Sequence, residues 1–263
     1  YKDFLIDCGG MDQDKASNLT VRRKMATLSS YFKFMLEKDI IDYNPVDGIR
    51  RPKKTPNKGT ECLSDNQVRL LLDYLDLQVV IKNEFTPHLH RILIYILFYT
   101  GIRVSELIQL KRKDYFLYNG MPAFKVLAKG GKTRILPVHE NLKLILEDYL
   151  KLLRLQLRKQ KMGILKGDDY LFFSLKNNRN LLRKNISRYG VYKILNQKAF
   201  QAGIRQKISP HSARATLITS LLDQGEDLYR VSLSVGHANP ETTKIYDKRN
   251  RSVKDNAILD INY

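Results

Sequence analysis

Apolar side chains near the start of the chain follow the spacing of an amphipathic helix. Between residues 20 and 37 they recur every three or four positions, at Val21, Met25, Leu28, Phe32 and Met35. Such spacing places them on one helical face. The stretch 42–48 is rich in turn-forming residues, and residues 50–59 hold two prolines, one glycine and no other apolar side chain. These breakers predict a helical unit over 1–51, a linker over 52–61 and a larger domain over 62–263.

Beyond the linker the pattern is mainly helical. Ser64 stands where it can cap a helix that carries Val68, Leu71, Leu72 and Leu75. The apolar segment 92–99 stops at Gly101. Apolar residues also have helical spacing in 142–157, 189–202 and 211–223, and Gly225 is a stop signal after the last of these.

Residues 123–138 differ from the rest because they contain two extended runs joined through Gly130 and Gly131. Paired glycines supply the positive φ angles of a tight hairpin turn. Lys129 and Lys132 are then expected at the tip of the hairpin. The predicted fold class is mainly α with one small β-sheet, an α+β fold.

Composition adds a strong positive charge to this picture. The 263 residues include 46 Lys and Arg against 27 Asp and Glu, a formal net charge of +19, and 43% hydrophobic residues can supply a core. The basic residues recur along the whole chain instead of gathering on one amphipathic helix, which favours nucleic acid over a membrane or an acidic protein as the partner. No run approaches the roughly 18 apolar residues of a spanning helix. We expect a soluble, cytoplasmic protein with no membrane contact.

Several chemistries have weak support in the sequence. Gly131-Lys132-Thr133 resembles the end of a phosphate-binding loop, but Val126 replaces the earlier glycine that such a loop needs, so ATP is not expected. His88 and His90 have no HExxH motif or carboxylate cluster beside them. Two cysteines form neither a disulfide framework nor a zinc site. We expect no metal and no cofactor.

Three segments carry the candidate chemistry. Ser209 and Pro210 predict a helix start after which His211 and Arg214, three residues apart, share one face. Downstream, His237 precedes a second helix start at 239–240 that would carry Tyr246 on a short helix. Upstream, Arg103 stands at the turn after Gly101, with Glu106 one helical turn further on.

Together these residue types are those that phosphoryl transfer without a metal requires. Two guanidiniums can hold a phosphodiester and stabilise the charge of its transition state. A tyrosine hydroxyl can attack phosphorus, His211 can handle its proton, and a lysine can protonate the departing 5′ oxygen. His237 would donate a further hydrogen bond to the phosphate.

The ordered set resembles the signature of the tyrosine recombinases, the family of the phage integrases and the bacterial Xer recombinases. Arg103, Lys129, His211, Arg214, His237 and Tyr246 match its catalytic positions, and Glu106 matches a supporting one. The resemblance covers residues 62 to 250 and implies strand cleavage through a 3′-phosphotyrosine and exchange through a Holliday junction, without ATP or metal. Lys129 is preferred to Lys132 because the family pattern favours the first lysine.

The resemblance also makes 1–51 a partial core-binding, DNA-binding domain and 62–263 a catalytic domain with a C-terminal helix. Because relatives usually open with a fuller helical domain, the chain is expected to be a fragment. The expected partner is double-stranded DNA with specific recombination sites, bound by a homotetramer. The tail 253–261 would dock on a neighbouring protomer or pack on its own domain. Contacts with DNA are expected from basic residues: Arg22, Arg23, Lys53, Lys54, Lys132 and Arg183.

Several functions share these residues. A mobile-element integrase or transposase, whose product is DNA integration, competes with a chromosome or plasmid dimer resolvase. A type IB topoisomerase uses the same chemistry on one duplex without paired sites. A DNA-binding protein that keeps the fold without catalysis is the alternative from another class. In each case we expect a nucleoid-associated protein that is encoded by a bacterium or by a mobile element.

Overall fold

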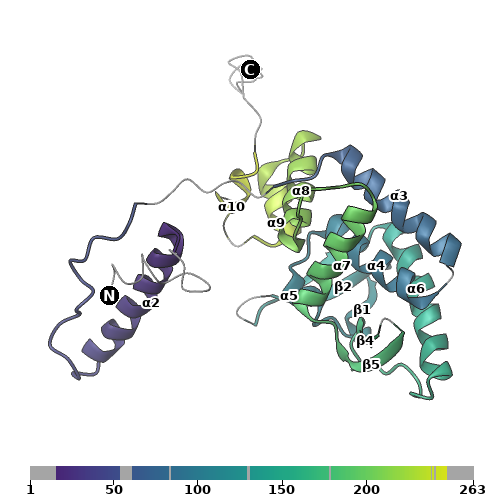
Figure 1. The fold of residues 1–263 in the computed structure, drawn as a ribbon, viewed down its shortest axis with the longest axis horizontal. Helices are drawn as coiled ribbons and strands as arrows, with labels where there is room; N and C mark the ends of the chain where they lie inside the picture. The colour runs from purple at the N-terminus through teal and green to yellow at the C-terminus, as the bar shows by residue number, and fades with distance from the viewer. Residues whose placement is uncertain are drawn as a thin grey trace, which may run out of the picture. The chain divides into compact units, whose positions relative to one another are not determined.

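The computed structural model describes residues 16–53, 61–82, 84–128, 131–177, 179–237, 239 and 241–247 (Figure 1). The chain divides into two compact units, 1–59 and 60–263, and the first ends inside the predicted linker. The predicted Lys54, Lys129 and tail 253–261 lie outside the described residues.

The first unit is built on the helix that the sequence predicts. Helix α2 (Asn18–Leu36) begins at Ser17, whose Oγ accepts a hydrogen bond from the Thr20 amide at 3.2 Å. Val21 and Met25 are buried and pack with Val46 from the loop that follows. The apolar face of α2 therefore covers a small core formed with its own return loop.

The second unit contains the remaining described elements. Its helices are α3 (Asp65–Lys82), α4 (Phe85–Thr100), α5 (Val104–Leu107), α6 (Glu140–Lys159), α7 (Arg188–Gln201), α8 (Pro210–Asp223), α9 (Leu228–Val235) and α10 (Glu241–Lys244), with a 3-10 turn η2 (Arg112–Asp114). Its strands are β1 (Tyr115–Tyr118), β2 (Met121–Leu127), β3 (Thr133–Pro137), β4 (Phe173–Lys176) and β5 (Asn180–Asn185). The mainly helical α+β class is confirmed.

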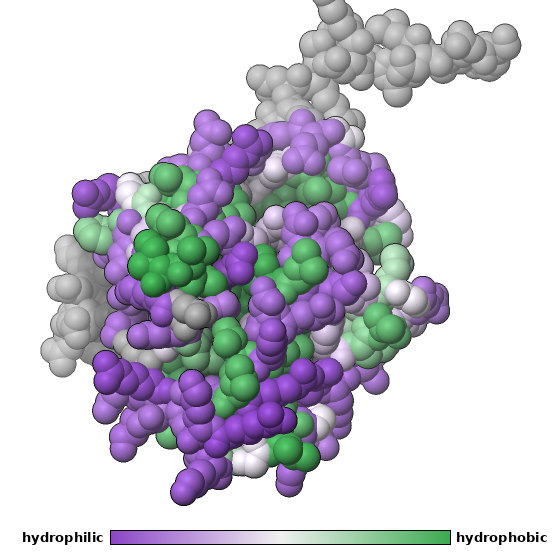
Figure 2. All heavy atoms as spheres, turned by 90° about the vertical axis from the view of Figure 1, so that its right-hand side faces the viewer, coloured by the Kyte–Doolittle hydropathy of each residue, from purple (hydrophilic) through white to green (hydrophobic). Residues whose placement is uncertain are grey.

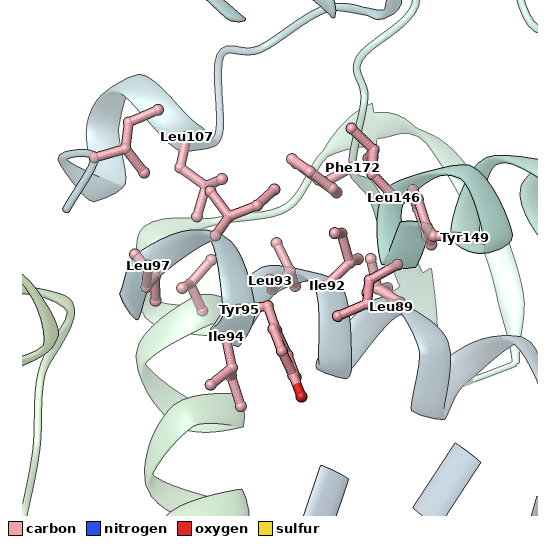
Figure 3. Close-up of a cluster of buried hydrophobic side chains, with 14 of the residues drawn as sticks. Leu89, Ile92, Leu93, Ile94, Tyr95, Leu97, Leu107, Leu146, Tyr149 and Phe172 are labelled. Carbon is pink, nitrogen blue, oxygen red and sulfur yellow. The ribbon is translucent and has the colours of Figure 1, made fainter. Parts of the chain in front are cut away.

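Helix α4 is the centre of the core. It buries 12 of its 16 residues, because a helix that is apolar on every side must be enclosed by other elements. Helices α3, α6 and α8 pack around it. Figure 3 shows Leu89, Ile92 and Leu93 of α4 facing Leu146 and Tyr149 of α6. The end of α4 is thus held firmly where the candidate chemistry begins.

The sheet content is larger than predicted. Strands β1, β2 and β3 form an antiparallel sheet in which Val126 pairs with Arg134, and this includes the predicted hairpin. A second antiparallel pair, β4 and β5, contradicts the prediction of a single sheet. Strand β5 reads Asn-Leu-Leu-Arg-Lys-Asn, which is short, polar and poor in β-branched residues, so its pairing is set by tertiary packing and not by local propensity.

One face of the molecule is mainly hydrophilic. Hydrophilic side chains cover most of the face in Figure 2, with smaller hydrophobic patches between them. On α6 the buried face is apolar, its first turn contains Glu140, and its last turn contains Arg158 and Lys159. None of the helices described has both the length and the apolar character that a membrane span needs.

Candidate active site

The fold brings together the three segments that the sequence singled out. Arg103 and Glu106 lie where α4 passes into α5, His211 and Arg214 lie in the first two turns of α8, and His237 follows α9. Tyr246 belongs to a turn just after α10, where its amide donates to the Thr243 carbonyl at 2.9 Å. The prediction that Tyr246 sits within a short helix is wrong, because α10 already ends at Lys244.

Arg103 is held by a carboxylate and by a main-chain carbonyl. It is the N-cap residue of α5, and its amide donates to Glu106 Oε2 at 3.0 Å. Its Nη1 donates to Glu106 Oε1 and its Nη2 to the Gly236 carbonyl, both at 3.0 Å. The Glu106 side chain is only 4% exposed, so it is not a surface carboxylate. The side chain of Arg103 remains 39% exposed and can receive a ligand.

Arg214 is a buried cation with unused hydrogen-bonding capacity. Ser209 caps α8 with Pro210 in the first turn, as predicted, and this places Arg214 one turn inside the unit. Its Nη1 donates to the Gly101 carbonyl, while its Nη2 is buried with no hydrogen-bond partner among the residues described. Burial and the neighbouring Arg103 and Arg134 lower the pKa of Arg214 to about 10. A bound anion would supply both the missing acceptor and the missing charge.

His237 is held by a threonine that the sequence analysis did not single out. Its Nδ1 lies 2.8 Å from Oγ1 of Thr243, which is fully buried. Burial, followed by the nearby Arg214 and Arg103, lowers the pKa of His237 to about 4. The imidazole is therefore neutral at pH 7, and its Nε2, which has no hydrogen bond within the described part of the chain, can contact a ligand.

Tyr246 and His211 lie within hydrogen-bonding distance of each other. The Tyr246 hydroxyl lies 3.3 Å from His211 Nε2. The tyrosine side chain packs against the small apolar cluster that α8 and α9 form, which includes Leu222 and Val235. Burial, Arg214 and Arg103 lower the pKa of His211, so its neutral imidazole can accept a proton from the hydroxyl.

A third arginine, Arg134 of β3, joins the site without having been predicted. Its Nη1 and Nη2 donate to the two oxygens of Glu106 at 3.2 and 3.1 Å. The sequence gives no signal for this contact, because 28 residues separate Arg134 from Glu106 and only the folded sheet brings them together. It gives no signal for Thr243 either, because its contact with His237 also depends on the fold. Both residues extend the predicted set.

The predicted DNA contacts fall into two groups. Arg23, Lys53 and Lys132 are exposed. Arg22 instead donates to the Pro52 carbonyl at 2.6 Å within the first unit.

Arg183 also has internal partners. Its guanidinium donates to the carbonyls of Met162 and Ile164 and pairs with Asp169 at 2.9 Å. The side chain is 36% exposed, so its contact with DNA stays a prediction.

The charges around Tyr246 define the kind of ligand that fits. The described site holds three guanidiniums and one carboxylate: Arg103 and Arg134 donate to Glu106, and Arg214 donates to the Gly101 carbonyl. The formal sum is +2, with both histidines taken as neutral. Among the described residues no three side chains of His, Cys, Asp or Glu group as a metal site would need. The arrangement suits a phosphodiester beside a tyrosine hydroxyl.

Comparison with known proteins gives the same reading. Residues 61–252 match the phage integrase family. The tyrosine recombinase XerD of Listeria monocytogenes serotype 4b is 31% identical over 234 residues, which cover 89% of this chain and 73% of the relative. XerD of Oceanobacillus iheyensis is 32% identical over 236 residues, with 89% and 72% covered.

Solved structures share the architecture. A XerH recombinase bound to its difH substrate before cleavage is 25% identical with a TM-score of 0.65, and the match covers 89% of this chain and 63% of that one. The chain thus spans less than two thirds of that recombinase. A lambda integrase dimer bound to a core site has the same fold at 17% identity and a TM-score of 0.60, with 86% and 74% covered. Because the family match spans well over half of the chain, the protein belongs to the phage integrase family and is a tyrosine recombinase.

Proposed function

We propose that the protein cleaves and rejoins DNA strands at specific sites through a covalent 3′-phosphotyrosine at Tyr246. The observation that carries the proposal is the buried Nη2 of Arg214, which has no partner among the described residues. The guanidinium of Arg214 interacts electrostatically with both members of the Tyr246–His211 pair. A scissile phosphate there would complete the hydrogen bonds of Arg214 and stand beside the attacking hydroxyl.

The cleavage step balances with residues of this chain. The Tyr246 oxygen forms a bond to phosphorus as the bond from phosphorus to the 5′ oxygen breaks, and the tyrosine proton passes to His211. Arg103, Arg214 and His237 stabilise the charge on the non-bridging oxygens. The proposed proton donor to the 5′ oxygen is Lys129. Resealing is the reverse reaction with a new 5′ hydroxyl, so the phosphodiester energy is kept and ATP is not consumed.

Paired DNA sites and several protomers are the proposed setting. Exposed basic side chains such as Arg23, Lys53 and Lys132 would contact the phosphate backbone, which makes binding strongly dependent on salt. We propose a homotetramer in which the segment 253–261 joins neighbouring protomers. Action on genomic DNA would place the enzyme at the nucleoid. The similarity to XerD relatives favours site-specific recombination within this class.

Covalent capture tests the proposal. The protein is incubated with a nicked, randomised duplex library without ATP or added metal, denatured in detergent, and assayed for attached DNA. Tyr229→Phe is the matched control because Tyr229 is 60% exposed and lies at the start of α9, away from the end that leads to His237. We expect adducts with the wild type and Tyr229→Phe and none with Tyr246→Phe.

Other outcomes separate the competing functions. Adducts that persist in Tyr246→Phe contradict the assigned nucleophile. DNA binding without adducts in any variant supports a non-catalytic DNA-binding protein. Relaxation of a supercoiled plasmid that lacks the captured site supports a type IB topoisomerase.

A further inference from the structure

Arg134 has no part in the proposed bond-making steps, yet the fold places it inside the site. Its side chain is 16% exposed, and its guanidinium pairs with both oxygens of Glu106 at 3.2 and 3.1 Å. Its Nε is buried with no partner in the described structure. A buried cation of this kind persists only where its charge is balanced or used.

The guanidinium of Arg134 joins three parts of the unit. The residue belongs to β3, the second strand of the β2–β3 hairpin. Glu106, its partner, belongs to α5. The third part is the end of α9, because a Cβ atom built on Gly236 would lie only 2.6 Å from Arg134 Nη1. The guanidinium therefore packs closely against Gly236, whose carbonyl holds Arg103 and whose neighbour is His237.

Charge gives the contact a second consequence. Glu106 is 4% exposed and faces two arginines. If Arg103 were its only partner, the carboxylate would cancel the charge that Arg103 offers to a phosphate. With Arg134 the trio sums to +1, so one positive charge remains for the ligand.

We propose that Arg134 is a positioning residue for strand cleavage, which neutralises Glu106 and fixes the Gly236–His237 turn and strand β3 against Arg103. The inference rests on the proposed function, since it assigns Arg134 a role in the same reaction. It predicts a defect in the chemical step with DNA binding preserved, because the Arg134 guanidinium is engaged with other groups of the site and its side chain is only 16% exposed.

Arg134→Met tests this, since methionine keeps much of the side-chain length and removes the charge and the donors. Single-turnover cleavage of the captured duplex is measured at saturating protein, together with the dissociation constant. We expect cleavage to slow by about 100-fold, the cost typical of a misplaced catalytic group, and the dissociation constant to change less than about threefold. Lys125→Met removes one positive charge from an exposed position on β2 of the same sheet, and it should cleave like the wild type.

A spectroscopic readout separates positioning from simple loss of packing. Arg134 is among the cations that lower the pKa of His237, so Arg134→Met should raise that pKa in an NMR titration of the imidazole. Arg134→Lys keeps the charge but not the paired hydrogen bonds. It should leave the His237 titration nearly unmoved and recover part of the rate, and it serves as the test if Arg134→Met does not fold.

Two results would overturn the proposal. One is cleavage by Arg134→Met within about threefold of the wild type. The other is a slowed reaction in Arg134→Met with an unchanged His237 titration. Failure of the proposed function has a different appearance, since the wild-type protein would then form no adduct at all.

Discussion

Gly236→Ala is the substitution for which the structure gives the sharpest magnitude. Gly236 ends α9 with φ of +72°, in the left-handed region, where an L residue costs about 1–2 kcal/mol. The added Cβ would also lie 2.6 Å from Arg134 Nη1. Arg134 must then shift from Glu106, and disturbing a buried ion pair costs up to about 3 kcal/mol more.

Gly225→Ala isolates the second contribution. Gly225 has φ of +90° and nothing within 4 Å of the added Cβ, so alanine there meets only the backbone cost. If Gly236→Ala loses about 3 kcal/mol more unfolding free energy than Gly225→Ala, its Tm should fall about 6–12 °C further for a unit of this size.

Thermal unfolding and single-turnover cleavage of both variants check the reasoning. Gly236→Ala should unfold at the lower temperature and cleave about 100-fold more slowly, whereas Gly225→Ala should cleave normally. Equal losses of Tm in the two variants, with cleavage intact in both, would show that Arg134 does not pack against this turn in solution.

Three further outcomes follow from the same structure. Thr243→Val removes the hydroxyl beside His237 and should slow cleavage about tenfold, the cost of roughly one hydrogen bond, whereas Thr243→Ser should keep the rate; single-turnover assays decide. The pKa of His237 is lowered to about 4 from 6.5, so the unfolded chain binds more protons than the folded protein between these two pH values. The unfolding free energy of the DNA-free protein should therefore fall as the pH drops through that window, and it should fall less in His237→Asn. Denaturant titrations at several pH values would measure both. Arg23→Ala should reduce the salt slope of DNA binding by about one, as binding isotherms would show. Arg22→Ala, which loses the bond to Pro52, should also destabilise the first unit by about 1 kcal/mol, as hydrogen exchange would show.

The parts of the fold that the sequence could predict are those that local chemistry decides. Ser209 and Pro210 start α8 where their types require, and Gly101 ends α4. Apolar spacing found α6 within two residues of its observed bounds. Strand β5 was beyond such reasoning, because its polar residues become a strand only by pairing with β4.

The candidate site divides in the same way. Arg103, His211 and Tyr246 could be named because the reaction needs their side-chain types in motifs of fixed spacing. Arg134 and Thr243 could not, since their roles depend on which atoms the folded sheet and the last turn bring near Glu106 and His237. Residues that hold other residues are defined by contact, and contact is a property of the tertiary structure.

Arg103 and Arg214, the two arginines proposed to bind the phosphate, are both anchored by main-chain carbonyls. Arg214 donates to the carbonyl of Gly101 and Arg103 to the carbonyl of Gly236, and each of these glycines ends a helix. A main-chain carbonyl is present whatever amino acid the gene specifies. No substitution can therefore remove either acceptor. A substitution can only move the carbonyl, by changing the backbone conformation at the end of the helix. The backbone conformation at the ends of α4 and α9 therefore sets the orientation of both guanidiniums.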